Sequence, residues 1–322
     1  MNIIIKTPHF IGDTIMMLPA LELLKMEYPN AKFTIVCREH SKDIFRGKEI
    51  EEIIVDDTKG KNRVKKTVAL IKTIRNKRYD LGVLFRNPLV DALIFKLSKI
   101  DTIIGYENEN RKIFLDFWIK IDRSRHYINH YANLVNQYLD NKYMTLPPMR
   151  LVTNEHNLIS KNSQKLIGFV LGSDKNTRGY PRDLSLKLFK ILKDKNFHIV
   201  LLGDHADMIS NSLYENQLLE DKVKVTNLSG KTTIAEFIDT INILDILVTI
   251  DTSALHVGAA TDTNFITLLG KGTSPFDVIK PKVDFGSYLF FAKAQIKDEE
   301  FIRQIKPVDI VDEIEKRLAS VS

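Results

Sequence analysis

The chain has 322 residues, of which 44% are hydrophobic and 27% are charged, the composition of an ordinary globular protein with room for two domains. No run approaches the roughly 18 apolar residues that a membrane-spanning helix needs, and the opening MNIIIKTPHF lacks the apolar core and cleavage site of a signal peptide. The lone Cys37 excludes an internal disulfide and is typical of a reducing compartment, so we expect a cytoplasmic protein.

The net charge of +6 is concentrated in two basic runs, KGKNRVKK at residues 59–66 and KTIRNKR at residues 72–78. Such runs either form solvated helix faces or attract an anionic partner such as a phosphorylated lipid, a nucleotide or a nucleic acid. The chain has no zinc-finger, RNP-like or aromatic-interleaved basic pattern, which argues against a nucleic acid.

Strand-like and helix-like segments alternate through the first half of the chain. Apolar runs predict strands at residues 3–6, 33–37, 51–57, 80–85 and 101–106, and helical spacing predicts helices at residues 14–27, 41–46, 63–77, 89–98 and 126–139. This alternation is typical of a parallel, doubly wound sheet. The paired prolines that follow, Pro147 and Pro148, indicate a stiff, extended connection.

A second, similar series begins after residue 150. It has expected strands at residues 165–172, 197–204, 224–230, 246–251 and 264–270, and expected helices at residues 183–194, 206–219, 233–243, 254–260 and 307–320. We therefore predict an α/β protein with two Rossmann-like domains, residues 1–150 and 151–322, whose parallel sheets face a central ligand cleft. The last helix could pack back on the N-terminal domain.

The first strand-to-helix turn, HFIGDTIMMLPALELL at residues 9–24, places Asp13 at the start of an apolar helix. Aspartate is a good helix cap, so the residue needs no further role. Loops at the carboxyl ends of parallel strands are also where α/β proteins place reactive groups, and a carboxylate there can accept a proton from an attacking hydroxyl. The two interpretations are compatible, because the turn that caps a helix can also hold a catalytic carboxylate.

The segment ILVTIDTSALHVGAA at residues 246–260 joins an apolar strand to a polar turn and a helix of small residues. The amides of that helix start, with the hydroxyls of Thr252 and Ser253, form a natural phosphate site, and His256 would lie one turn further along. The alternative is that Asp251 or Ser253 merely caps the helix.

A polar, cationic loop follows the strand in GFVLGSDKNTRGYP at residues 168–181. Gly172 and Ser173 allow close approach to the backbone, and Lys175 and Arg178 could contact a diphosphate. Arginine suits this role because it offers paired donors and keeps its charge. A solvent-exposed loop without a ligand is the alternative.

Other motifs are weaker. GxGxxG and the complete Walker pattern are absent, and GKTT at residues 230–233 matches only the tail of a Walker motif. His126 and His130 have a metal-ligand spacing but lack the glutamate of HExxH and an obvious third ligand. We therefore expect no metal and interpret them as surface or acceptor-groove histidines.

Together, these segments predict a nucleoside diphosphate held by the second domain and facing an acid of the first. That arrangement suits group transfer from an activated sugar. A carboxylate would deprotonate the acceptor hydroxyl, and cations with helix amides would stabilise the leaving phosphate.

The motifs, in this order, resemble glycosyltransferase family 9, the ADP-heptose:lipopolysaccharide heptosyltransferases, over nearly the whole chain. IIIKTPHFIGDTIMMLPAL is similar to the family's strand, Gly-Asp pair and Leu-Pro-Ala-Leu helix, and DTSALHVGAA to its Asp-Ser/Thr-Gly-x-x-His-x-x-Ala motif. NLSGKTTIAEF and LLGKGTSP resemble its Gly-Lys-Thr/Ser-Leu and Gly-x-Thr-x-Pro segments. The resemblance implies the two-domain GT-B fold.

The resemblance also implies site residues. Asp13 would be the catalytic base, and Arg178 would act with it in place of the family's phosphate-binding lysine. The family's tryptophan and glycine are replaced here by Tyr180 and Ser253. The donor would be held by Ser173, Lys231, Thr232, Asp251, Thr252, Ser253 and His256, and its ribose by Glu236, which matches the family's glutamate after a one-residue shift from Ala235.

Three segments of the first domain, at residues 84–94, 105–111 and 126–134, are similar to the second-heptose enzymes. There Arg86, Asn87 and Arg111 would contact the acids or phosphates of a lipopolysaccharide inner core, or else would serve packing and capping.

We therefore expect an inverting, metal-independent transferase without a cofactor. It would move heptose from ADP-heptose to a lipid A–Kdo acceptor at the cytoplasmic face of the inner membrane. The alternatives are a family 9 transferase with another donor or acceptor, in capsule or outer-core assembly, and a non-catalytic nucleotide-sugar-binding protein. The sequence predicts no particular oligomeric state.

Overall fold

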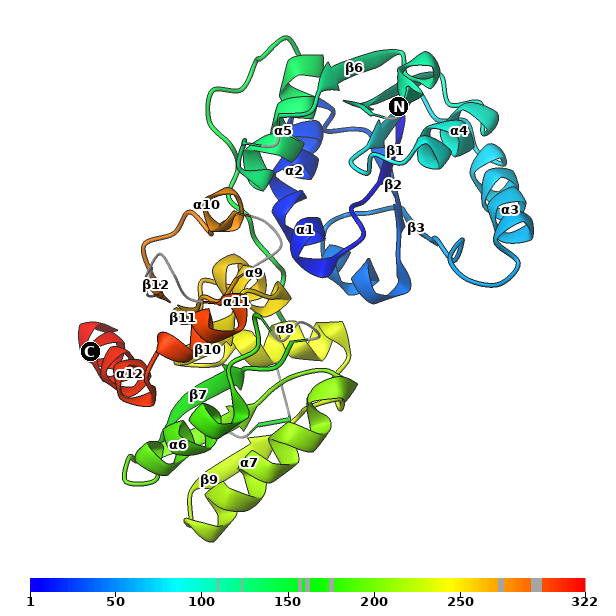
Figure 1. The fold of residues 1–322 in the computed structure, drawn as a ribbon. Helices are drawn as coiled ribbons and strands as arrows, with labels where there is room; N and C mark the ends of the chain where they lie inside the picture. Colours follow the sequence, from blue (N-terminus) through cyan, green and yellow to red (C-terminus); the bar gives the residue numbers. More distant parts are fainter. Residues whose placement is uncertain are drawn as a thin grey trace. The chain divides into compact units, whose positions relative to one another are not determined.

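The computed structural model describes residues 1–108, 110–122, 124–155, 158–159, 163–173, 177–271, 275–290 and 297–321, without the side chains of residues 299 and 321. The chain forms two compact units (Figure 1). Unit 1 comprises residues 1–152 and 277–279, and unit 2 comprises residues 153–276 and 280–322.

Unit 1 contains a six-stranded parallel sheet with the order β3-β2-β1-β4-β5-β6. The strands are β1 (Asn2–Lys6), β2 (Lys32–Cys37), β3 (Glu52–Val55), β4 (Leu81–Leu84), β5 (Thr102–Glu107) and β6 (Phe117–Lys120). In the centre of the sheet, Ile4 of β1 is in register with Thr34 of β2 and Gly82 of β4. All six strands therefore end at the same edge of the sheet, which is where unit 1 gathers its polar side chains.

Helices cover both faces of this sheet. They are α1 (Ile11–Met16), α2 (Leu18–Glu27), α3 (Arg63–Arg75), α4 (Leu89–Leu97) and α5 (Tyr127–Tyr138), with the 3-10 turns η1 (Glu39–Phe45) and η2 (Arg111–Phe114). α1 and α2 pack against α5, whereas α3 packs against α4, and α4 against η2. Right-handed crossovers put α3 and α4 on the face opposite α1 and α2, as Figure 1 shows.

The helix expected at residues 14–27 is in fact two helices that meet at Met17. Pro19 occupies the first turn of α2, where its missing N–H is tolerated, but within one continuous helix it would remove a hydrogen bond. The break leaves α1 as a short helix directly after the first strand of the sheet.

Unit 2 repeats the architecture with the strand order β12-β11-β10-β7-β8-β9, again all parallel. Its strands are β7 (Lys165–Val170), β8 (Phe197–Leu201), β9 (Lys224–Asn227), β10 (Ile246–Ile250), β11 (Phe265–Leu268) and β12 (Gly286–Leu289). The remaining helical segments are α6 (Arg182–Leu192), η3 (His205–Asp207), α7 (Met208–Glu220), α8 (Ile234–Asn242), α9 (Ser253–Ala260), α10 (Phe276–Ile279), α11 (Asp298–Phe301), η4 (Ile302–Gln304) and α12 (Pro307–Val321). The predicted α/β class with parallel sheets is confirmed.

The C-terminal helix belongs to unit 2. α12 packs against α6 and against β10 and β11 of this unit, and its packing on the N-terminal domain stays a prediction. The apolar side of α12, formed by Ile310, Val311 and Ile314, is buried in the core of this unit. This stripe anchors the helix to unit 2, whereas Val308 in its first turn remains 46% exposed.

The strands β6 and β12 were not predicted. Each has four residues and lies at an edge of its sheet, and most of their residues are only partly buried. An edge strand of a parallel sheet loses the continuous apolar run that marks the central strands. Among the helices that the structure describes, none combines the length and the apolar character needed to cross a membrane.

Candidate active site

Asp13 lies in the first turn of α1, at the carboxyl edge of the unit 1 sheet. The capping interpretation is wrong, because Phe10 occupies the N-cap position and no side chain caps this helix. Within the described part of the chain, the Asp13 carboxylate has neither a hydrogen bond nor an ion pair. The turn is instead held by the Thr14 hydroxyl, which donates to the Phe10 carbonyl at 2.9 Å.

Burial raises the pKa of Asp13 to about 6. The cause is desolvation, which disfavours the charged form of a carboxyl group that no donor compensates. Burial raises the pKa of Tyr131, a residue of α5, and the negative charge of Asp13 raises it further. A carboxyl group that ionises near neutrality can exchange protons with a substrate hydroxyl, so Asp13 has the chemistry of a general base.

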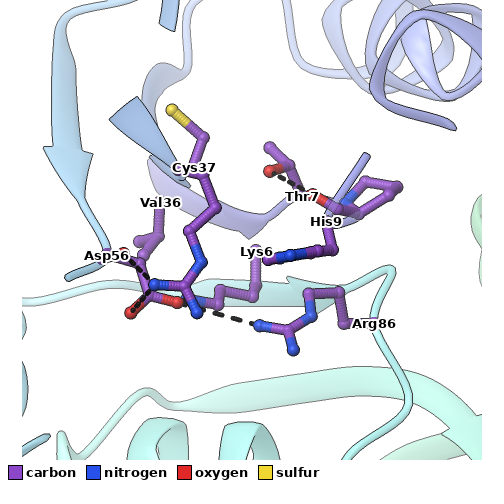
Figure 2. Close-up of a pocket in the computed structure, with 9 residues that line it drawn as sticks. Lys6, Thr7, His9, Val36, Cys37, Asp56 and Arg86 are labelled. Carbon is purple, nitrogen blue, oxygen red and sulfur yellow. Dashed lines mark hydrogen bonds and ion pairs between the residues drawn. The ribbon is translucent and has the colours of Figure 1, made fainter. Parts of the chain in front are cut away.

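A group of charged side chains, buried or partly buried, lies at the same edge, and only Arg86 among them was predicted from the sequence as a site residue. It combines Lys6 at the end of β1, Arg38 after β2, Asp56 after β3, Arg86 after β4 and Asp91 in α4. Figure 2 shows Lys6, Asp56 and Arg86 converging. Lys6 donates to Asp56, Arg86 Nη1 lies 3.7 Å from Asp56 Oδ2 and 3.5 Å from Asp91 Oδ2, and Arg38 Nη1 donates to the Asp56 carbonyl at 2.5 Å.

The charges of this group do not cancel, because three cations face two carboxylates. Burial alone would raise the pKa of Asp56, but the Lys6 ammonium and bonds from Lys6 and Thr58 hold it below its usual range. The pKa of Asp91 is raised, mainly by burial. This group of five side chains therefore carries excess positive charge, which favours an anionic ligand.

The pocket in Figure 2 is lined by the three cations of this cluster and Asp56, together with Thr7, His9 and Cys37. Burial, assisted by the charges of Arg38 and Arg86, lowers the pKa of His9. His9 Nδ1 and Arg38 Nε are buried without a hydrogen-bond partner among the described residues. Burial raises the pKa of Cys37 to about 12, which makes the thiol a poor nucleophile.

The three predicted acceptor residues have different environments. Arg86 belongs to the charged cluster and remains partly exposed, and the neighbouring Asn87 has a buried Oδ1 without a hydrogen-bond partner among the described residues. Arg111 is fully buried, and it donates to the carbonyls of Tyr106 at 2.7 Å, Arg86 at 2.5 Å and Pro88 at 3.4 Å. This burial favours the packing alternative for Arg111, which fixes the backbone that carries Arg86 and Asn87, and its contact with an acceptor stays a prediction.

The histidine pair is also corrected. His126 and His130 are buried rather than at the surface, and His126 caps α5 by accepting from the Ile128 amide at 3.3 Å. His130 stacks on Tyr106 with ring centroids 3.9 Å apart, and burial lowers its pKa to about 4. The part of the chain that the structure describes contains no cluster of three His, Cys, Asp or Glu side chains able to hold a metal.

In unit 2, Arg178 and Asp251 come together. Arg178 Nη1 donates to the Asp251 carbonyl at 3.2 Å and lies 3.7 Å from its carboxylate. Burial raises the pKa of Asp251, although the guanidinium opposes the rise. Gly270, after β11, makes this arrangement possible, because a Cβ there would lie 2.3 Å from the Thr177 carbonyl. The loop carrying Arg178 thus lies directly on the backbone at Gly270.

The phosphate-type turn forms as predicted in its backbone. Thr252 is the N-cap residue of α9 and Ser253 is its first residue, so the helix start follows β10 directly. No side chain caps the helix, which removes the simple capping role proposed for Asp251 or Ser253. His256 is buried one turn further along the helix.

The GKTT turn follows β9, with Gly230 in the left-handed region at φ 66° and its amide donating to the Gly203 carbonyl at 3.0 Å. Lys231 donates to the Asn227 carbonyl at 2.9 Å. Thr232 is partly buried beside it. Glu236 accepts from the Thr233 amide at 2.7 Å and closes a capping box at the start of α8, which gives it a structural role in addition to any ligand contact.

Ser173 lines a cavity of about 510 Å³ after β7, together with Gly172, Arg182, Asp207 and Arg303. Strands of a sheet are about 4.8 Å apart, so the turns after β9, β8, β7 and β10 cover roughly 14 Å of one edge. That distance suits an extended nucleotide rather than a single ion. The predicted contact Lys175 lies outside the described residues, as does the Gly-Thr-Ser stretch of LLGKGTSP at residues 272–274.

Comparisons with known proteins show the family and the fold of this chain. A family model described as glycosyltransferase family 9 (heptosyltransferase) matches residues 67–278, a range that contains Arg86, Arg178 and Asp251 but begins after Asp13. The lipooligosaccharide heptosyltransferase 2 of Campylobacter jejuni is 23% identical over 98% of this chain and 99% of its own. The lipopolysaccharide heptosyltransferase 2 of Salmonella typhimurium is 24% identical over 86% of this chain and 84% of its own.

Solved structures show the same fold. The ADP-heptose LPS heptosyltransferase II of Escherichia coli matches with a TM-score of 0.87 at 22% identity, over 99% of both chains. The E. coli heptosyltransferase WaaC with ADP matches with a TM-score of 0.76 at 18% identity, over 99% of this chain and 98% of that one. These matches confirm the expected GT-B fold.

Proposed function

Because the chain belongs to glycosyltransferase family 9 and is therefore a glycosyltransferase, we propose that it transfers heptose from ADP-heptose to the inner core of a lipopolysaccharide. The observation that carries the mechanism is Asp13, a partly buried carboxyl group with a pKa of about 6 that has no hydrogen-bond or ion-pair partner among the described residues. The names of the relatives, lipooligosaccharide or lipopolysaccharide heptosyltransferase 2, support a second-heptose reaction.

In the proposed reaction, the Asp13 carboxylate accepts the proton of the acceptor hydroxyl while the oxygen of that hydroxyl attacks the anomeric carbon of heptose. The bond between that carbon and the β-phosphate oxygen breaks, and ADP leaves with the bonding pair. A single displacement of this kind inverts the anomeric configuration. Asp13 is mostly ionised at pH 7 because its pKa is about 6.

The donor contacts come from the edge of unit 2. Arg178 and the start of α9 at Thr252 and Ser253 stabilise the charge that develops on the leaving diphosphate, since cations and helix amides favour anions. Ser173, Lys231, Thr232, Asp251, His256 and Glu236 complete the proposed donor site. The ADP named for the E. coli WaaC structure supports an ADP-sugar donor.

The acceptor contacts come from the edge of unit 1. The excess positive charge around Lys6, Arg38 and Arg86 suits an acceptor with acidic groups, such as lipid A carrying Kdo. A lipid acceptor of this kind would place the enzyme at the cytoplasmic face of the inner membrane. The proposed reaction needs no metal and no cofactor.

The test is ADP release from ADP-heptose, with lipid A carrying Kdo alone or Kdo plus one heptose. We expect turnover with the heptosylated acceptor, and kcat/KM should fall about tenfold per pH unit below pH 6 as Asp13 becomes protonated. Asp13→Asn should lower kcat by about 100-fold or more and remove this pH dependence. Asp140→Asn, at an exposed aspartate of the same unit, should behave like the wild type.

The outcomes separate the alternatives. Turnover with Kdo alone would make the protein a first-heptose enzyme. Activity retained in the Asp13→Asn protein would contradict the base role but not the transfer. ADP binding without turnover on either acceptor would favour a nucleotide-sugar-binding protein or a family member with another acceptor.

A further inference from the structure

Three leucines lie exposed along one side of α4. Leu89, Leu93 and Leu97 are spaced four residues apart, and their exposed fractions are 38%, 38% and 49%. Residues four apart in a helix lie above one another, so the three form a continuous apolar stripe. The opposite side of the helix holds Ala92, Ile94 and Phe95 in the core, so packing within unit 1 does not need the stripe.

The neighbouring helix α3 repeats this pattern. Val64 is 79% exposed and Val68 is 46% exposed, one turn apart, while Leu70 and Ile74 are buried. Large apolar side chains at this exposure are isolated on most surfaces, but here five occur on two adjacent helices.

The exposed charges around these apolar residues are positive. α3 contains five basic residues and no acidic one, and Arg63, Lys65, Lys72 and Arg75 have no acidic partner among the described residues. Two further lysines are paired, Lys66 with Asp57 at 2.6 Å and Lys96 with Asp116 at 3.6 Å.

Both helices cover the same face of the unit 1 sheet and pack against each other, as Figure 1 shows. Each buries one side against the sheet, so their exposed sides point away from it in the same general direction. Apolar and basic side chains therefore share one outer surface, which we call the α3–α4 face: Arg63, Val64, Lys65, Val68, Lys72, Arg75, Leu89, Leu93 and Leu97.

We infer that the α3–α4 face binds the surface of an anionic lipid bilayer. Apolar side chains enter the boundary between headgroups and acyl chains, while lysines and arginines contact the lipid phosphates. This inference names the surface that would hold the protein at the membrane location proposed above. It rests on that proposal only through the lipid nature of the acceptor, because Asp13 and Arg178 are not part of the α3–α4 face.

Two other occupants fit the observations less well. A symmetric dimer through this face would oppose one positive surface with its identical copy, which electrostatic repulsion disfavours. A nucleic acid would use the cations but would leave five exposed apolar side chains without a role. A bilayer with negative headgroups would contact both the cations and the exposed apolar side chains.

The test is co-sedimentation of the full chain with vesicles of phosphatidylglycerol and phosphatidylcholine, compared with vesicles of phosphatidylcholine alone. We expect binding to the anionic vesicles that weakens with salt. Lys65→Glu/Lys72→Glu and Val64→Gln/Val68→Gln should each reduce partitioning by about tenfold or more. The matched control, Lys187→Glu/Lys190→Glu on exposed positions of α6, should bind like the wild type.

Turnover on a water-soluble, deacylated acceptor keeps this test distinct from the transfer reaction. All four proteins should show equal turnover there, since none of the changed residues belongs to the active site. Equal vesicle binding by wild type and both α3 variants would overturn the inference, and so would absence of binding by the wild type. A dimer that Val64→Gln/Val68→Gln dissociates, without vesicle binding, would assign the face to a second copy instead.

Discussion

At the scale of single residues, Asp13 combines a functional property with a penalty in stability. A carboxyl group without donors becomes a better base because burial raises its pKa, here to about 6. The same burial makes the ionised form unfavourable in the folded state. The pH dependence of stability can therefore reveal the environment of Asp13 without any substrate.

Asp13→Asn should stabilise the protein by about 2–3 kcal/mol at pH 8, where the wild type must keep a partly buried, desolvated carboxylate charged. The folded pKa lies above the ordinary value of 3.8, so the favourable contribution of this group is complete below pH 3.8 and is lost as the pH rises through about 6. The difference between the two proteins should narrow as the pH falls towards 4. Urea denaturation at pH 5 and pH 8 measures the difference in free energy of unfolding between the two proteins. Equal stabilities of wild type and Asp13→Asn at pH 8 would mean that water solvates the carboxylate.

Arg111 illustrates the opposite case, a charged residue whose role is structural. Its guanidinium is fully buried and its donors satisfy backbone carbonyls at Tyr106, Arg86 and Pro88. Gly105 makes room for it, because a Cβ there would lie 2.6 Å from Arg111 Nη2. Arg111 thus acts as a positioning residue for the loop after β4.

At the scale of elements, turns at the carboxyl ends of strands position the residues of the proposed active site. In unit 2 the loop before α6 must lie close to the backbone after β11 for Arg178 to reach Asp251. The Lys271 amide donates to the Thr177 carbonyl at 3.2 Å, and this hydrogen bond holds the loop before α6 against the segment after β11. A side chain at Gly270 would separate the two segments.

Gly270→Ala should therefore weaken ADP binding by about tenfold, roughly 1.4 kcal/mol, because its Cβ would displace Thr177 and with it Arg178. The control is Gly168→Ala in β7, whose Cβ would meet the flexible Leu244 side chain at 2.3 Å. That change should lower stability but keep the ADP affinity. Calorimetric titration of both proteins at a temperature where they are folded distinguishes loop displacement from general destabilisation, and an unchanged affinity in Gly270→Ala would contradict the proposed role of this loop.

At the scale of the whole molecule, the chain divides into two units, each with its own sheet and core. The proposed donor contacts all belong to unit 2. A ligand that binds only the folded form of one unit stabilises that unit by mass action. The effect of ADP on local opening should therefore differ between the two sheets.

When ADP is present at about 100 times its Kd, amide hydrogen exchange in β7 and β10 should slow by up to roughly 100-fold, because exchange there needs opening of unit 2. Exchange in β1 and β4 of unit 1 should change little. The matched comparison is the Arg178→Met protein, in which the same nucleotide concentration should protect unit 2 less. Equal protection of both sheets would show that they open together or that ADP contacts both.

Much of this architecture followed from local sequence. The central strands carry continuous apolar runs and the helices carry periodic ones, so the parallel sheets, the turn at Asp13 and the helix start at Thr252 were predictable. The short edge strands β6 and β12 were not, because their half-exposed residues lack those patterns. Pro19 marks the helix break at Met17, but the apolar spacing continues across it, so periodicity alone predicts one helix.

By itself, the sequence determined which residues stand at the ends of strands, since that depends on neighbours along the chain. Only the tertiary structure decided what those residues meet. The order β3-β2-β1-β4 brings Asp56 beside Lys6 and Arg86, while the fold buries Arg111 beneath the loop after β4 and leaves Asp13 without a donor among the described residues. Burial and charge pairing are properties of three-dimensional neighbours, and these set the pKa of the carboxyl group that we propose as the base and give Arg111 its structural contacts.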